Sequence, residues 1–478
     1  MLKLFGAGKA AHPLADAKEA RRVLGELPQD PHEALAELAH WHESVAAAEG
    51  FRADARLQAL FAVDDAAQPR LRKLSRDYVA AARPSRFQEN RIWTAVYGYW
   101  QLAASAYARA VDALRQDAKS AEGVRAQLPL LAVRALRAAG QQAKWLYLRY
   151  APVDAAIWRA LNGAYAFAEE RSVAQSRCAV YPAVQEESTP RLEYVRAVVL
   201  NASSPDSLLP TEIELAERLI GELAPAIDLA PNAMPGVSHW MDLSQAAPPQ
   251  RLARQPSLGA GVRFLSAARA AAELERMIQR AEASGQLPAA MAGAMEGEAA
   301  VDLLRHLLLY WSPVPPERRH PRHHVKSRLS IVHGFEGVLA ALQGAAADKQ
   351  GAENWIVENV SAGGFGAVVP QAKGDWLKIG ALLAMQPDGG NNWVIGIVRR
   401  VSKSSGSEAR VGIETLSRAP EVLRFSIHGT EQPAVLLPSP GAATGETAIA
   451  LKTGAFVPGL NLEAARAGGN YLYLPQTL

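Results

Sequence analysis

The stretch NWIVENVSAGGFGAVV, residues 354–369, decides how the carboxy-terminal third of this chain folds. Apolar and β-branched residues dominate both of its ends, 354–360 and 366–369, and this composition predicts two β-strands. The intervening SAGGF, residues 361–365, favours a turn, because glycine adopts backbone angles that other residues avoid. The stretch is therefore expected to form a β-hairpin.

Four further strands are predicted around this hairpin, over residues 325–333, 381–386, 393–401 and 409–416. Glycine and polar residues mark two hairpin turns between them, PDGGNN at 387–392 and KSSGS at 403–407. Six short antiparallel strands within about a hundred residues predict a small β-barrel. A β-rich extension over residues 421–478 could extend this barrel or form a second one, with strands expected at 422–427, 434–437, 448–451 and 471–474.

The region before the barrel differs in composition. Residues 1–204 are rich in Ala, Leu, Arg and Glu, with apolar residues at helical spacing, which predicts an all-α domain. Residues 205–311 mix helical and strand-like patterns and are expected to form a mixed α/β segment. The sequence SPVPPE, residues 312–317, predicts a stiff linker, because its prolines cannot continue the preceding helix. We therefore expect a multidomain α+β protein whose barrel domain spans residues 312–420.

Charge and cysteine content narrow the function classes. The chain of 478 residues has 51 Lys and Arg against 48 Asp and Glu, a formal net charge of +3, so an anion site has to be local and no DNA partner is expected. Cys178 is the single cysteine, which excludes an internal disulfide and suits a reducing cytoplasm. No apolar run is long enough to span a bilayer. We expect a cytoplasmic protein.

Two short motifs carry the functional signal. The sequence ERRHPR, residues 317–322, directly precedes the first predicted strand and supplies Arg318 and Arg322 at four-residue spacing. The hairpin turn supplies Asn359, Ser361 and Gly364. Together and in this order, the motifs resemble the PilZ family, which is marked by Arg-x-x-x-Arg ahead of its barrel and Asp/Asn-x-Ser-x-x-Gly after the second strand. The resemblance covers about residues 314–418.

The resemblance implies a receptor for cyclic di-GMP. This ligand presents two phosphodiesters and two guanine edges, and the planar arginine fork pairs with both kinds of acceptor. The implied ligand-binding residues are Arg318, Arg319, Arg322, Asn359, Ser361, Gly363 and Gly364. Arg399 and Arg400 are further possible contacts; they are adjacent on a predicted strand, so one should face the exterior and one the interior or rim. Residues 340–353 form an Ala- and Gly-rich insert that is longer than members of the family usually carry.

Other kinds of site have weaker support. His320, His323, His324 and His333 cluster in sequence, but the prolines around them disfavour a helix and no Cys, Asp or Glu ligand lies among them, so no metal site is expected. We find no catalytic motif and no cofactor fingerprint, and therefore expect no enzyme and no cofactor. Binding would order the arginine segment and signal to the helical domain, which is expected to recruit an unknown protein partner. The alternatives are a scaffold whose barrel binds no ligand, and an enzyme hidden in the helical or mixed region.

Overall fold

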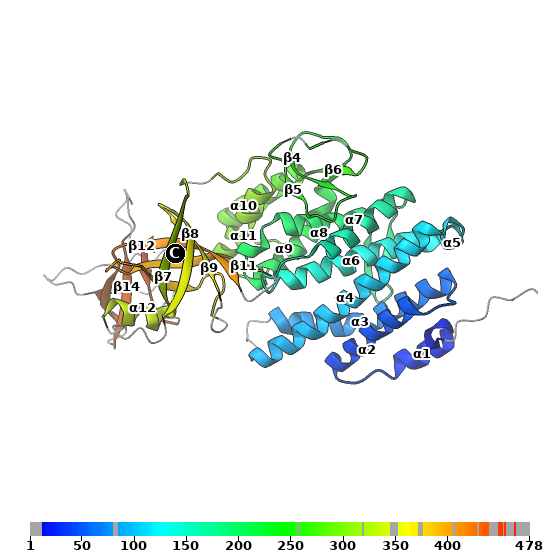
Figure 1. The fold of residues 1–478 in the computed structure, drawn as a ribbon, viewed down its shortest axis with the longest axis horizontal. Helices are drawn as coiled ribbons and strands as arrows, with labels where there is room; N and C mark the ends of the chain where they lie inside the picture. The colour runs from blue at the N-terminus through cyan, green and yellow to red at the C-terminus, as the bar shows by residue number, and fades with distance from the viewer. Residues whose placement is uncertain are drawn as a thin grey trace, which may run out of the picture. The chain divides into compact units, whose positions relative to one another are not determined.

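A computed structural model describes most of the chain, in two compact units (Figure 1). The helical unit comprises residues 1–149, 153–205 and 210–316, and the barrel unit comprises residues 150–152, 206–209 and 317–478. Within these units the described residues are 12–79, 85–254, 256–257, 259–317, 320–344, 352–370, 376–404, 408–427, 430–438, 448–452, 454–455 and 463–464.

The helical unit is built mainly from amphipathic helices. Its long helices in chain order are α1 (Ala17–Gly25), α2 (Pro31–Ala47), α3 (Ala53–Val79), α4 (Arg86–Gln116), α6 (Leu128–Tyr147), α7 (Ala155–Glu170), α8 (Pro190–Ala202), α9 (Pro210–Leu223), α10 (Ala268–Ser284) and α11 (Gly297–Trp311), with a short α5 (Ala118–Gly123) between. Several begin at side chains that cap the first turn, such as Asp30 before α2 and Ser85 before α4. Ser85 and Gln88 form a capping box, which satisfies two backbone donors.

Strands interrupt this helical unit in two places. A hairpin of β1 (Cys178–Tyr181) and β2 (Val184–Ser188) lies within the region that the sequence predicts to be all-α. A small sheet follows in the order β3-β6-β4-β5, formed by β3 (Asp228–Ala230), β4 (Val237–Asp242), β5 (Gln250–Arg251) and β6 (Val262–Ser266). The helices and sheet of 210–316 belong to the same unit as the amino-terminal helices.

The predicted barrel is confirmed. It closes in the order β10-β11-β12-β9-β8-β7, and every neighbouring pair is antiparallel. Its strands are β7 (His323–His333), β8 (Glu353–Ser361), β9 (Gly364–Val369), β10 (Leu382–Pro387), β11 (Val394–Lys403) and β12 (Ala409–Ser417). All six agree with the predicted segments to within a few residues, because runs of β-branched and apolar residues mark the strands and glycine and polar residues mark the turns between them.

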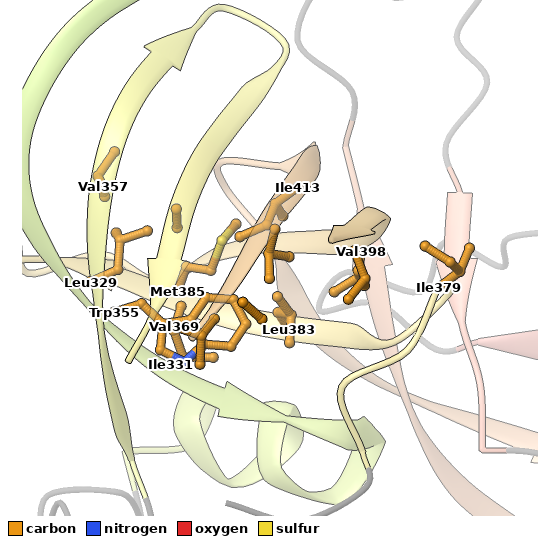
Figure 2. Close-up of a cluster of buried hydrophobic side chains, with 14 of the residues drawn as sticks. Leu329, Ile331, Trp355, Val357, Val369, Ile379, Leu383, Met385, Val398 and Ile413 are labelled. Atoms are coloured by element: carbon orange, nitrogen blue, oxygen red, sulfur yellow. The ribbon is translucent and has the colours of Figure 1, made fainter. Parts of the chain in front are cut away.

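Apolar side chains fill the barrel (Figure 2). Leu329, Ile331, Trp355, Leu383 and Met385 are among the residues that converge there from different strands. Tyr150 belongs to the same buried cluster, although its segment, residues 150–152, lies far from the barrel strands in sequence.

The predicted extension contributes a separate sheet instead of more barrel strands. It has the order β15-β14-β13-β16, formed by β13 (Glu421–Ile427), β14 (Thr430–Leu437), β15 (Ala448–Ala450) and β16 (Glu463–Ala464). The unpredicted helix α12 (Gly334–Leu342) covers residues where the insert begins. Val338 and Ala341 of α12 pack with Val435 of β14 and with Ile395 of the barrel. The strand predicted at 471–474 lies outside the described residues.

Candidate functional site

A β-bulge at Glu358 sets the direction of the motif residues that follow it. Val357 pairs with Ala367, yet Asn359 pairs with Gly366, so β8 has one residue more than β9 at this point. Val357 and Ala367 both belong to the barrel core. Side chains alternate along β9, and paired residues share a face, so Asn359 lies on the outer face of the barrel. Without the bulge, Asn359 would follow Val357 into the core.

The Asn359 side chain lies against Gly366. A β-carbon at Gly366 would come within 2.6 Å of Asn359 Nδ2 and 2.7 Å of Oδ1, distances that no side chain could accept without displacing the amide. Glycine at position 366 therefore makes the space in which the Asn359 amide rests. The sequence motif does not include this glycine.

The turn itself depends on Gly364. A β-carbon there would lie 1.9 Å from the carbonyl oxygen of Ile413 on β12, so position 364 admits no larger residue in this backbone. The turn is further held by Thr415, whose backbone N–H donates to the Gly363 carbonyl at 2.9 Å. Ser361 Oγ lies 3.4 Å from the Gly364 carbonyl. The turn of residues 361–364 is thus bound to the end of β12.

The segment before β7 reaches this turn. A β-carbon at Gly363 would come within 3.1 Å of the Cδ2 atom of His320, so the imidazole of His320 lies directly over Gly363. His324 pairs with Asn359 in the β7–β8 ladder. Arg322, between these histidines, is exposed. Arg318 and Arg319 lie outside the described residues.

Arg418 is a neighbour of the turn that the sequence analysis missed. Its Nη2 donates to the carbonyl of Ala362 at 3.0 Å, and the side chain is exposed. The backbone before it is fixed, because the buried Ser417 donates its hydroxyl to the Pro438 carbonyl at 2.9 Å. In the sequence, Arg418 is a single arginine that follows a predicted strand, and it belongs to no recognisable motif.

Arg399 and Arg400 are both exposed, instead of facing opposite sides of the barrel wall. The β11–β12 ladder shifts register between Val398 and Arg400, and this bulge cancels the alternation expected for adjacent residues. Arg399 Nε donates to Glu414 at 2.6 Å, and Glu414 pairs in register with Gly364. Arg400 forms an ion pair with Asp206 of the same unit at 2.6 Å.

The histidines do not gather at one point. His333 stacks on Trp376 with ring centroids 4.0 Å apart, and burial lowers the pKa of His333. The Trp376 indole N–H in turn donates to the buried Glu353 at 3.1 Å, as does that of Trp355 at 3.0 Å. Among the described residues, no group of three His, Cys, Asp or Glu is arranged to hold a metal ion.

Comparison with protein families gives two matches, both to one family. Residues 18–233 match the N-terminal domain of the cyclic-di-GMP receptor FimW, and residues 340–421 match its middle PilZ domain. The chain belongs to this receptor family. The receptor thus carries both domains in the family's order, and the PilZ match contains the turn from Asn359 to Gly364. The arginine segment 317–322 precedes the matched range. No curated protein matches the receptor.

The part of the receptor that the structure describes contains no helix long and apolar enough to cross a membrane. The family descriptions name a receptor and mention no catalytic activity.

Proposed function

We propose that this receptor binds cyclic di-GMP on the outer face of its barrel, where the segment before β7 meets the turn between β8 and β9. The ligand-binding residues in this proposal are Arg318, Arg319, Arg322, Asn359, Ser361, Gly363 and Gly364. The observation that carries it is the His320 ring over Gly363, since His320 is a residue of the arginine segment and Gly363 of the turn.

Each half of the site has a separate chemical task. The arginines offer planar forks to phosphodiester oxygens and to guanine O6 and N7. Asn359 and Ser361 offer short polar groups from a rigid strand end. Gly363 leaves room for the His320 ring, and Gly364 lets the turn pack against Ile413 of β12, so the two glycines fix the shape of the backbone that the ligand would meet. Charge on the ligand and charge on the segment therefore meet beside a turn whose shape the glycines fix.

Calorimetric titration of the full chain with cyclic di-GMP tests this proposal. We expect a dissociation constant in the low-micromolar range or below, about −8 kcal/mol or better. Cyclic di-AMP is the matched control ligand, because it keeps both phosphodiesters and lacks the guanine O6 acceptors. Folded protein that gives no heat with cyclic di-GMP at about 100 μM would refute the proposal.

We further propose a cytoplasmic receptor that transmits binding to its helical unit, for recruitment of a protein partner, without any catalytic step. The chain passes between the two units at residues 149/150, 152/153, 205/206, 209/210 and 316/317. The two short segments 150–152 and 206–209 are held within the barrel unit by hydrogen bonds. Lys403 N–H donates to the Tyr150 carbonyl at 2.8 Å, and the Tyr150 hydroxyl donates to the Leu208 carbonyl at 3.1 Å.

The start of the linker is equally fixed within the helical unit. Arg251 donates to the carbonyls of Tyr310 and Val314, and Trp311 donates its indole N–H to Ser203 at 2.9 Å. A ligand that immobilises Arg322 therefore acts on a linker whose first residues, up to Val314, are held by hydrogen bonds. A flexible linker would absorb such a restraint, whereas the prolines at 313, 315 and 316 stiffen this one.

Amide hydrogen exchange tests transmission. With saturating cyclic di-GMP we expect slower exchange in residues 300–325 and altered exchange in at least one helix of the helical unit. The Arg322→Ala variant under the same ligand concentration is the control for binding. Changes restricted to the barrel unit would show that the two units respond independently.

A further inference from the structure

A cleft of about 710 Å³ opens within the helical unit. Helices α3, α4, α6, α8 and α9 and the β1–β2 hairpin all contribute to its lining. We call it the helical cleft; Arg72, Arg76, Tyr181 and Arg196 are the lining residues that matter below. Its volume lies within the range of small-molecule sites, roughly 300–1,000 Å³.

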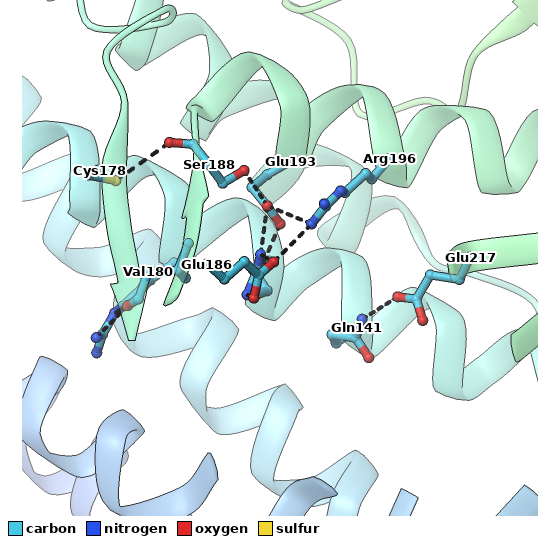
Figure 3. A network of polar contacts seen from close by, with 10 residues as sticks. Gln141, Cys178, Val180, Glu186, Ser188, Glu193, Arg196 and Glu217 are labelled. Atoms are coloured by element: carbon cyan, nitrogen blue, oxygen red, sulfur yellow. Dashed lines mark hydrogen bonds and ion pairs between the residues drawn. The ribbon is translucent and has the colours of Figure 1, made fainter. Parts of the chain in front are cut away.

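Four of the five glutamates that line the helical cleft are already paired, and the fifth, Glu222, is exposed. Arg137 bridges Glu186 and Glu193 at 2.7 and 2.8 Å (Figure 3), and Lys144 forms ion pairs with Glu214 and Glu217. Burial alone would raise the pKa of Glu193, but Arg137 and Arg196 outweigh it and lower the pKa to about 2. Glu193 is therefore ionised at neutral pH. The paired acids present little unbalanced negative charge to the cleft.

Two arginines of α3 that line the helical cleft have no such partner. Arg72 and Arg76 are one turn apart on α3, on the same side of the helix, and both are exposed. Among the described residues, neither makes a hydrogen bond or an ion pair. An i, i+4 pair of free guanidinium groups at the rim of a cleft is suited to hold an oxyanion from two sides.

Inside the cleft, two buried donors lack acceptors. Tyr181 Oη and Arg196 Nε are both inaccessible to solvent and have no hydrogen-bond partner in the described part of the chain. The Tyr181 ring lies between Arg134 and Arg137, whose guanidinium carbons are 4.8 and 5.6 Å from its centroid. Burial raises the pKa of Tyr181, so its hydroxyl keeps the proton and remains a donor.

Position 221 makes room for the second of these donors. A β-carbon at Gly221 of α9 would come within 3.3 Å of Arg196 Nη2, so the guanidinium group lies over the glycine backbone. Arg196 uses only its Nη1 in the bonds to Glu186 and Glu193. Its remaining donors are thus turned away from the carboxylates. Buried donors without partners are uncommon in folded proteins, and each calls for an acceptor.

We propose that the helical cleft binds a small organic anion whose phosphate or carboxylate oxygens accept hydrogen bonds from Arg72, Arg76, Arg196 and Tyr181. The paired glutamates fix the inner arginines in place, and the two rim arginines supply the charge that attracts the anion. The site is independent of the cyclic di-GMP site on the barrel, and it gives the helical unit a ligand of its own.

Titration calorimetry on the full chain with three probes tests this proposal: GMP, inorganic pyrophosphate and citrate. We expect at least one to bind with a dissociation constant below about 1 mM. Preference for GMP or pyrophosphate over citrate would identify phosphate as the recognised group, and the reverse preference would identify carboxylate. Binding should persist in Arg322→Ala, which separates this cleft from the barrel. If none of the three probes binds, the proposal fails.

Variants locate the binding. The double variant Arg72→Gln, Arg76→Gln should weaken the bound probe at least tenfold, whereas Lys73→Gln on the same helix should not change it. Tyr181→Phe should weaken the probe about threefold or more, without lowering the melting temperature of the unliganded protein, because it removes a hydroxyl that has no partner. Undiminished affinity in the double variant overturns the proposal. A lower melting temperature of unliganded Tyr181→Phe would assign that hydroxyl a structural partner instead, and would remove Tyr181 from the site.

Discussion

Arginine has opposite roles in the two units. Around the barrel turn, Arg322 and Arg418 are exposed, so the fold loses little if either is removed. In the helical unit, Arg137 is only 12% exposed and lies between the carboxylates of Glu186 and Glu193. The Glu193 side chain is itself only 4% exposed. We propose that arginine binds ligand at Arg322, where water reaches it, whereas the buried Arg137 is part of the fold. Exposure and pairing distinguish the two uses; residue type does not.

The largest effect of this difference is expected at Arg137. Arg137→Ala should lower the free energy of unfolding of the helical unit by about 3–5 kcal/mol, because it leaves the buried Glu193 carboxylate without its main partner. Urea denaturation of the full chain measures this. Arg177→Ala is the control, since Arg177 is 81% exposed and its partner Glu187 lies at 3.9 Å. Equal stabilities of the two variants would contradict a structural role for Arg137.

The second largest effect is expected at acidic pH, where the helical unit should lose stability. Burial lowers the pKa of His42 and of His239 in the helical unit to about 4, from an ordinary 6.5. Below pH 6.5 the unfolded chain takes up protons that the folded unit refuses until about pH 4, so stability falls as pH drops through this window. We expect a loss of about 2 kcal/mol per histidine between pH 7 and pH 5.

Urea denaturation at a series of pH values checks this loss. His40→Gln serves as the control, because the His40 side chain is 76% exposed. His42→Gln should flatten the curve by about half if the two buried histidines contribute equally. A stability that is constant from pH 7 to pH 5 would mean that these imidazoles accept protons in the folded unit.

Arg322→Ala should weaken ligand binding and leave stability unchanged, whereas Arg137→Ala should lower stability. We expect cyclic di-GMP to bind at least tenfold more weakly, since a hydrogen bond from a charged donor is worth roughly 1.5–3 kcal/mol. The melting temperature without ligand should not move, because Arg322 is exposed. Calorimetry and thermal denaturation of the same sample give both values. Early melting of the unliganded variant would make Arg322 a structural residue.

The sequence predicts regular features of the barrel better than local irregularities. Runs of β-branched and apolar residues are enough to find strands such as β8 and β11, and the motif residues could be named from their spacing. The bulge at Glu358 is invisible in sequence, because a strand with one extra residue has no special composition. Yet this bulge turns Asn359 outward. The helix α12 was not predicted for a related reason, since its Ala, Gly and Leu residues are equally compatible with an irregular insert.

Contacts between residues distant in sequence escape prediction altogether. Nothing in the pattern around Tyr150 indicates that it belongs to the barrel core more than 170 residues later, with Leu329 as a neighbour in the same cluster. Likewise, Arg418 and Ala362 meet only because the end of β12 lies beside the turn. Pairings of this kind depend on the closed topology and not on any local preference.

The smallest expected effect tests how the turn presents Asn359. Gly366→Ala places a methyl group where the Asn359 amide now rests, 2.6 Å from Nδ2, so the amide has to rotate away. If Asn359 contributes one hydrogen bond to the ligand, binding should weaken by about 0.5–1.5 kcal/mol, roughly three- to tenfold. Gly390→Ala in the turn between β10 and β11 is the matched control, because its new methyl would meet the Pro387 carbonyl oxygen at 3.2 Å and no residue of the proposed site. Calorimetry with cyclic di-GMP compares the two variants. Equal affinities would show that the orientation of Asn359 does not matter to the ligand, and the outer-face site would then rest on the arginine segment alone.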